Sequence, residues 1–134
     1  MKKEIEIDGI KIGPNHPPYI IAEISGNHNG DIDRAKKLIN EAKNAGASAV
    51  KLQTYTADSL TINSTRDEFI LKTGTWKGRK LYELYEEAHT PLNWFAELFS
   101  YAKDIKITIF SSPFDLQAVQ LLEDLNAPAY KIAS

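Results

Sequence analysis

The sequence predicts an α/β fold in which parallel strands alternate with helices, as in a (β/α)8 TIM barrel truncated to about its first four strands. Two observations carry this prediction. Short apolar runs without a polar face recur along the chain, as expected for strands that are covered on both sides. Amphipathic segments with apolar residues at helical spacing lie between them. Because no helix follows the fourth strand, half of a barrel is favoured over a complete small domain.

The composition of the 134 residues is that of a globular domain with a core. Lysine and arginine total 16 and acidic residues 18, which gives a formal net charge of −2, so neither a nucleic acid nor a membrane surface is an expected partner. The chain has no cysteine, which excludes disulfides and thiolate metal sites. No apolar run approaches a membrane span, and the first residues lack the apolar core of a signal peptide. We therefore expect a cytoplasmic protein.

Residues 1–18 are predicted to form a hairpin followed by an extended connector. Apolar and polar residues alternate on both sides of Asp8-Gly9, a pair that favours the type I′ turn. The prolines that follow Gly13 exclude a helix before residue 19. A hairpin in this place could plug the end of the barrel opposite the site.

Residues 19–134 are predicted to hold the strands and helices of the half barrel. The strands are expected at 19–24, 49–54, 107–111 and 129–132, and the helices at about 32–45, 91–103 and 116–125. Asp31, Thr90 and Asp115 precede the three helices as N-caps, and Gly46 ends the first helix. The third helix is expected to bury a stripe made of Leu116, Val119, Leu122 and Leu125.

A long insertion, residues 55–90, interrupts the alternation directly after the second strand. Long loops at the carboxyl end of a strand usually carry function or act as lids. Trp76 lies between two glycines in this insertion. It either contacts a ligand or anchors the loop to the barrel wall.

Polar side chains interrupt or directly follow the apolar strands at their carboxyl ends, where barrel enzymes place their catalytic groups. Glu23 and Lys51 stand inside apolar runs, and a buried charge is costly unless it is paired or functional. The full set of candidates is Glu23, Lys51, Gln53, Ser112, Lys131 and Ser134. Two lysines with hydroxyl partners suit an anionic phosphate or carboxylate. Each residue alone could instead be a structural ion-pair partner or a capping hydroxyl.

Four stretches in order carry the most specific signal. They read Ile-Ala-Glu-Ile-Ser-Gly-Asn-His-Asn-Gly, Ala-Val-Lys-Leu-Gln-Thr-Tyr, Phe-Ser-Ser-Pro-Phe-Asp and Tyr-Lys-Ile-Ala-Ser. They resemble the successive motifs of the sialic acid synthase family, whose members condense phosphoenolpyruvate with an N-acetylated amino sugar to make nine-carbon ulosonic acids. Within the family, the first loop and the insertion are most similar to those of pseudaminic acid synthases.

The resemblance implies a role for each candidate residue. Glu23 is implied to contact the sugar and the reacting centre, and Gln53 to lie in the same pocket. The residues implied to hold phosphoenolpyruvate are Lys51, Ser112, Lys131 and Ser134. A divalent metal, Mn²⁺ or Mg²⁺, is also implied, but its two histidine ligands belong to later strands, so no metal ligand is expected in this chain. The complete protein is expected to be a homodimer, and the chain as given an inactive fragment.

Two other interpretations stay open. A Schiff-base aldolase of the same fold would use Lys51 or Lys131 as its nucleophile. Alternatively, the chain is a non-catalytic half-barrel interaction unit whose unclosed sheet pairs with another copy.

Overall fold

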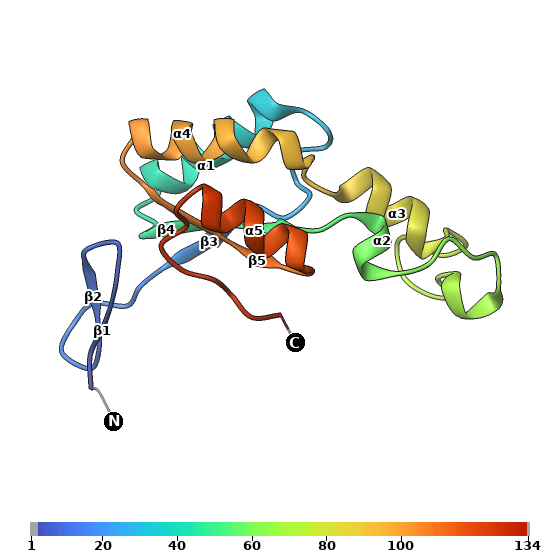
Figure 1. Ribbon diagram of the computed structural model, residues 1–134, viewed down its shortest axis with the longest axis horizontal. Helices are drawn as coiled ribbons and strands as arrows, with labels where there is room; N and C mark the ends of the chain where they lie inside the picture. Colours follow the sequence, from blue (N-terminus) through green and yellow to red (C-terminus); the bar gives the residue numbers. More distant parts are fainter. Residues whose placement is uncertain (1–2, 134) are drawn as a thin grey trace.

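A computed structural model describes residues 3–133 and shows a parallel sheet of three strands with helices packed against it (Figure 1). The strands are β3 (Ile21–Glu23), β4 (Ala49–Thr54) and β5 (Thr108–Pro113). β3 pairs with β4 and β4 with β5, and both pairings are parallel. The predicted alternation of parallel strands with helices is therefore confirmed over these three strands.

Two of the predicted helix caps form as expected. Helix α1 (Ile32–Asn44) begins after Asp31, whose side chain accepts hydrogen bonds from two backbone N–H groups of the first turn. Helix α5 (Leu116–Asp124) begins after Asp115, which accepts one from the N–H of Ala118 at 2.7 Å. Such caps satisfy N–H groups that have no partner within the helix and are each worth about 1 kcal/mol. Just past the end of α1, Gly46 adopts φ +89°, the left-handed conformation that favours glycine.

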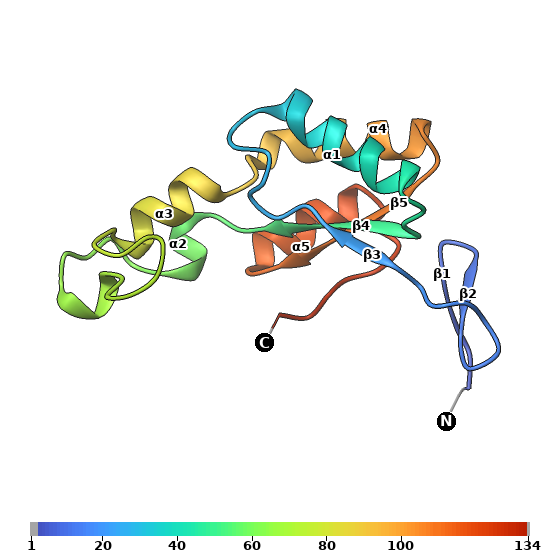
Figure 2. The ribbon, with the colours of Figure 1, turned by 180° about the vertical axis from the view of Figure 1, so that it is seen from behind.

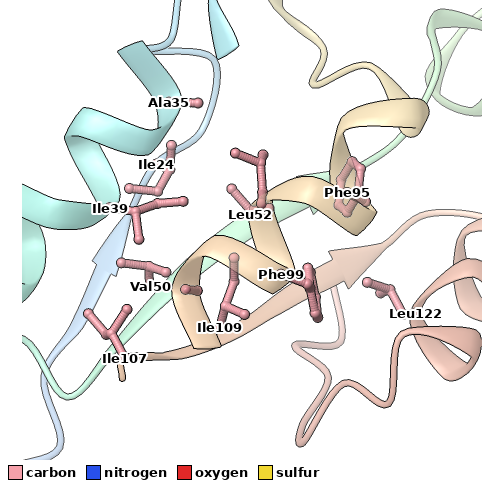
Figure 3. Packing of buried hydrophobic residues seen from close by; sticks show 12 residues of the cluster. Ile24, Ala35, Ile39, Val50, Leu52, Phe95, Phe99, Ile107, Ile109 and Leu122 are labelled. Carbon is pink, nitrogen blue, oxygen red and sulfur yellow. The ribbon is translucent and has the colours of Figure 1, made fainter. Parts of the chain in front are cut away.

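The core lies between the sheet and a layer formed by α1 and α4 (Phe95–Asp104), which run side by side over one face (Figure 1). Ile39 of α1, Leu52 of β4 and Leu98 of α4 are fully buried in it. Figure 3 shows the side chains of this core between α1, α4 and the strands. Each such side chain contributes about 1.5–3 kcal/mol by leaving water, so this layer fixes the sheet that positions the site.

The N-terminal hairpin also forms as predicted. Strands β1 (Ile5–Ile7) and β2 (Ile10–Ile12) are antiparallel and are joined through Asp8 and Gly9, which both have positive φ. The carboxylate of Asp8 accepts a hydrogen bond of 2.8 Å from the hydroxyl of Thr108, the first residue of β5. The hairpin therefore lies at the amino ends of the strands.

The insertion projects from the opposite end of the sheet, beyond the carboxyl end of β4 (Figure 2). It contains α2 (Ala57–Leu60), a 3₁₀ turn η1 (Asp67–Phe69) and α3 (Leu81–Ala88). An antiparallel bridge between Ile70 and Lys80 closes the base of its longest loop. Among the described residues, no helix is long and apolar enough to cross a membrane.

The predicted fourth strand at 129–132 is wrong as a strand. Only Tyr130 pairs, through one parallel bridge to Ser111 of β5, and the N–H of Lys131 donates to the Ser111 carbonyl at 3.1 Å. The direction agrees with the prediction, but no further strand lies on the other side of this segment in the part of the chain that the structure describes. Ser134 lies outside the described residues.

Two burial predictions are corrected at the edges of the sheet. The first strand is not covered on both sides, because Ile20 is 55% exposed and Ile21 is 43% exposed. On α5, Leu122 is buried as predicted, but Leu116 is 88% exposed and Val119 is 38% exposed. No element among residues 3–133 packs against these side chains, so their apolar surfaces stay exposed.

The predicted cap at Thr90 is also wrong. The chain enters α4 through a 3₁₀ turn, η2 (Leu92–Trp94), and Pro91 has the non-helical ψ of 131°. Thr90 is 2% exposed, and its hydroxyl bonds to the ring of His28. The Thr90 hydroxyl therefore bonds to His28 and does not cap the helix as predicted.

Candidate functional site at the carboxyl end of the sheet

An ion pair between Glu23 and Lys51 is the centre of the candidate site. The two residues are register partners on β3 and β4, so their side chains leave the same face of the sheet. The Lys51 ammonium contacts the Glu23 carboxylate, and the two side chains are 16% and 37% exposed. The carboxylate compensates the partly buried lysine charge, which would be costly without a partner. The pair faces away from the α1–α4 layer, because the alternate residues Ile24, Val50 and Leu52 pack against that layer.

Ser25 and Gln53 extend the polar site beyond the ion pair. The Ser25 hydroxyl lies 3.4 Å from Oε1 of Glu23 and 3.4 Å from Oε1 of Gln53. Both are acceptors for a single hydroxyl proton, so Ser25 links the two strands at the start of the first loop. The prediction that Gln53 shares the pocket of Glu23 agrees with this contact.

Ser112 reaches the same face from β5. It is the register partner of Gln53 and is 2% exposed. Its neighbour Ser111 points to the other face, where it shares a 2.7 Å hydrogen bond with Thr54. The alternation of the strand therefore assigns Ser112 to the site and Ser111 to the scaffold.

Lys131 is not brought into contact with this group. Its side chain is exposed, and across the described residues no hydrogen bond or ion pair joins it to Lys51, Glu23 or Ser112. The predicted convergence of the two lysines near Ser112 is therefore absent from this structure. The preceding residue, Tyr130, donates to Glu123 of α5 on the helix side, so alternation assigns Lys131 to the side of Ser112.

A cleft of about 560 Å³ lies beside the ion pair. Its lining comes from the loop 25–30, from Gln53 and Tyr55 at the end of β4, and from the insertion, which contributes Trp76 and Glu87. Trp76 is 54% exposed and lines this cleft. Of the two interpretations of Trp76, the structure favours a ligand contact over an anchor on the barrel wall.

A larger hollow of about 740 Å³ lies at the opposite end, between the hairpin, α4 and α5. Asp8 and Thr108 line it, and none of the predicted site residues does. Because Glu23, Lys51, Gln53 and Ser112 gather at the carboxyl ends of the strands, we place the candidate site there, next to the cleft.

His28 holds the first loop to the insertion, a role that sequence reasoning missed. The side chain is fully buried, its Nδ1 accepts the N–H of Gly30 at 3.1 Å, and its Nε2 lies 3.1 Å from the hydroxyl of Thr90. Since Nδ1 accepts, the ring proton is on Nε2 and is donated to Thr90. Burial, and to a lesser degree the nearby His89, lowers the pKa of His28. No local sequence signal links His28 to a threonine 62 residues further on.

Gly26 allows the same loop to approach α3 closely. A Cβ atom added to Gly26 would lie 2.6 Å from the carbonyl oxygen of Ala88, the last residue of α3. Any side chain would force the two segments apart. The loop 25–30 and the end of the insertion therefore form one wall of the cleft together.

The metal implied by the family resemblance finds no binding group in this part of the protein. Residues 3–133 contain no cluster of three or more histidine, aspartate, glutamate or cysteine side chains that could hold a metal ion. His28 is occupied by Gly30 and Thr90, and His16 contacts Glu4 on the hairpin. The described residues therefore do not fit a metal centre.

Comparison with known proteins places this geometry in a family. The NeuB family model matches residues 38–134. The chain is 53% identical over 118 residues to a pseudaminic acid synthase of Helicobacter pylori, which covers 88% of this chain and 35% of that protein. It is 35% identical over 135 residues to the N-acetylneuraminate-9-phosphate synthase of Mus musculus, covering 100% of this chain and 37% of that protein.

A solved structure shows the same fold. The N-acetylneuraminic acid synthetase of Leptospira borgpetersenii, solved in complex with citrate, superposes with a TM-score of 0.78 at 30% identity, covering 96% of this chain and 40% of that one. This likeness shows a TIM-barrel fold, of which the described residues form a part. The chain belongs to the NeuB family. It spans about a third of the length of the curated relatives that it matches.

Proposed function

We propose that this chain is part of an enzyme that condenses phosphoenolpyruvate with an N-acetylated amino sugar to form a nine-carbon ulosonic acid, pseudaminic acid in particular. The observation that carries the proposal is the Glu23–Lys51 pair, joined by Ser25, Gln53 and Ser112 on one face at the carboxyl ends of the strands. The identity to pseudaminic acid synthases supports the choice of product.

Lys51 and Ser112 are the proposed contacts to phosphoenolpyruvate. An ammonium group and a hydroxyl on one face offer charge-assisted donors to a phosphate or carboxylate. Lys51 is held by Glu23 in this structure, so an arriving anion would share or replace that partner. Lys131 and Ser134, which the resemblance also assigns to phosphoenolpyruvate, are proposed to join this group when the substrate is bound.

In the proposed reaction, the enol carbon of phosphoenolpyruvate attacks the sugar aldehyde and forms the new C–C bond. Water adds to the cation that results at the former enol carbon, and phosphate then leaves by C–O cleavage. Lys51 compensates the phosphate charge during these steps. Glu23 is the proposed base, which would accept a proton from a sugar hydroxyl or from the attacking water. Its carboxylate lies 3.4 Å from the Ser25 hydroxyl at the edge of the cleft.

The Schiff-base aldolase is the less favoured alternative. A nucleophilic lysine needs a free amine, but Lys51 is engaged with the carboxylate of Glu23. Borohydride treatment in the presence of substrate would trap an adduct on Lys51 or Lys131 if the aldolase interpretation held. The homodimer and the cytoplasmic location stay predictions for the complete protein, as does the divalent metal.

The test is a direct assay of the full-length protein. Phosphoenolpyruvate is supplied with either a 2,4-diacetamido-2,4,6-trideoxy sugar or N-acetylmannosamine, and phosphate and the nine-carbon product are followed by colorimetry and mass spectrometry. We expect phosphate release only when a sugar is present, with faster turnover of the diacetamido sugar. Absence of product with both sugars would refute the condensation. Equal or faster turnover of N-acetylmannosamine would refute the assignment to pseudaminic acid.

A further inference from the structure

The cleft adjoins the proposed reaction centre through Ser25 and Gln53, whereas Glu23 and Lys51 do not line it. Ser25 and Gln53 line the cleft and lie 3.4 Å apart, and Ser25 also contacts the Glu23 carboxylate. A molecule whose reacting carbon lies near Glu23 would therefore have the rest of its body in the cleft. The volume of about 560 Å³ is within the range of small-molecule sites.

The walls of the cleft differ in chemistry. The loop 25–30 contributes Asn27 and Asn29, whose amides carry donors and acceptors, although one N–H of Asn27 donates to the Ile24 carbonyl at 3.1 Å. The insertion contributes the half-exposed indole of Trp76 and the side chain of Leu84. A ligand that suits both walls has amide or hydroxyl groups on one side and apolar C–H or methyl groups on the other.

Trp76 is held in place by the main chain of its loop. Its carbonyl accepts the N–H of Arg79 at 3.1 Å, and Leu71 exchanges hydrogen bonds with Gly78 and Arg79 across the loop. The Arg79 guanidinium pairs with Glu87 of α3, another residue of the cleft. The indole is therefore carried by a closed turn that is tied to α3, a geometry suited to a binding platform.

We propose that this cleft binds the body of the amino sugar and that Trp76 is a specificity-determining residue. The inference rests on the proposed function, because the ligand is the sugar of that reaction. A 2,4-diacetamido-2,4,6-trideoxy sugar has an acetamido group at C4 and a methyl group at C6, where N-acetylmannosamine has hydroxyls. Both substituents end in a methyl group. The indole packs against these methyl groups and gains apolar contact with the trideoxy sugar, whereas a hydroxyl placed there loses hydration without a partner.

The experiment compares Trp76→Ala and Trp76→Phe in the full-length protein, with Ile62→Ala as the matched control. Ile62 is 62% exposed on the same insertion and does not line the cleft. We expect Trp76→Ala to raise the KM for the diacetamido sugar roughly tenfold. The KM for phosphoenolpyruvate and the KM for N-acetylmannosamine should stay within about twofold of wild type, so that the preference between the sugars is lost. Trp76→Phe should restore most of the preference, and Ile62→Ala should keep it in full.

The two claims fail in different ways. If wild type turns over the sugar but Trp76→Ala keeps the wild-type preference, the role of Trp76 is refuted and the condensation stands. If wild type shows no condensation, calorimetric titration of the diacetamido sugar into wild type and Trp76→Ala decides the inference alone. Binding that weakens roughly tenfold in the variant would support the cleft. Equal binding to both proteins, or no binding to wild type, would overturn it.

Discussion

The buried histidine of the first loop shows how a residue that resembles a catalytic group can be structural. Both ring nitrogens of His28 are occupied, by the Gly30 N–H and by the Thr90 hydroxyl, and the ring packs edge-on against Trp94 with centroids 5.3 Å apart. A ring with no free nitrogen cannot serve as a base without breaking the loop. Its contribution is to fix the loop that carries Ser25 and lines the cleft.

The protonation of His28 makes a prediction about stability. Burial lowers the pKa of His28 in the folded state below the ordinary histidine value of about 6.5. Below about pH 6.5 the unfolded chain therefore binds a proton that the folded chain does not. The free energy of unfolding decreases as the pH is lowered, until His28 is protonated in the folded state as well. His28→Gln, which cannot titrate, should flatten this fall below about pH 6.5 while lowering stability by about 1–3 kcal/mol through lost hydrogen bonding and packing.

Urea unfolding midpoints at several pH values provide the measurement for His28. The matched control is His16→Gln, which removes an accessible histidine paired with Glu4 and should retain the fall. An unchanged pH dependence in His28→Gln would mean that another group causes it.

At the scale of elements, two segments far apart in the sequence build one wall of the cleft. The loop after β3 and the end of α3 meet at Gly26, and the hydrogen bond between His28 and Thr90 lies next to this contact. The insertion is thus joined to the first βα loop as well as to β4. A change at the contact should reach the cleft even though Gly26 has no side chain to offer a ligand.

The contact at Gly26 can be tested by adding one methyl group. Gly26→Ala should lose about 1–3 kcal/mol of stability, because the new Cβ meets the Ala88 carbonyl at 2.6 Å. It should also weaken sugar binding by displacing the end of α3. Gly46→Ala serves as the control, since φ is +89° there and nothing lies within 4 Å of the new Cβ. It should lose a similar 1–2 kcal/mol, roughly, from left-handed strain while binding the sugar normally.

Chemical unfolding and calorimetry with the amino sugar give both readouts for the glycine variants. Equal sugar binding by Gly26→Ala and Gly46→Ala would show that the loop contact does not shape the cleft.

At the scale of the whole molecule, the sequence patterns predicted the helices and strands whose formation depends on residues close together in the chain. Helix α1 with its Asp31 cap and strand β4 from 49 to 54 agree with the prediction because periodicity and capping act within a few residues. The predicted burial of Ile21 and of Leu116 was wrong, because no element among residues 3–133 covers these apolar side chains. The segment at Tyr130 pairs with β5 through a single bridge, although the sequence pattern predicts a strand there.

The candidate site was predictable to the extent that strand alternation places side chains. Glu23, Lys51, Gln53 and Ser112 share one face because the register of β3, β4 and β5 is regular. Lys131 lies in a segment with a single bridge, so alternation indicates its side of the sheet but no strand ladder holds its side chain near Lys51. Two contacts could not be predicted, namely the hydrogen bond between His28 and Thr90 and the approach of Ala88 to Gly26. Both depend on tertiary packing between distant segments, which sequence periodicity does not indicate.

The division of the molecule into a helix layer and a polar face offers a matched pair of lysines. Lys51 pairs with Glu23 on the site face, and Lys36 of α1 pairs with Glu97 of α4 on the surface of the helix layer. Both lysines are engaged with a glutamate. Only Lys51 lies where the proposed anion would bind, so the two ion pairs separate a binding role from a structural one.

The most direct measurement is the affinity of the full-length protein for phosphoenolpyruvate, determined by calorimetry in wild type, Lys51→Met and Lys36→Met, with circular dichroism to verify folding. A charge-assisted contact is worth about 1.5–3 kcal/mol, so Lys51→Met should weaken binding roughly ten- to hundred-fold. Lys36→Met should bind as wild type does, and affinity for the sugar should change much less in either variant. If folded Lys51→Met bound phosphoenolpyruvate as tightly as wild type, Lys51 would be only the structural partner of Glu23, and the proposed anion site would be wrong.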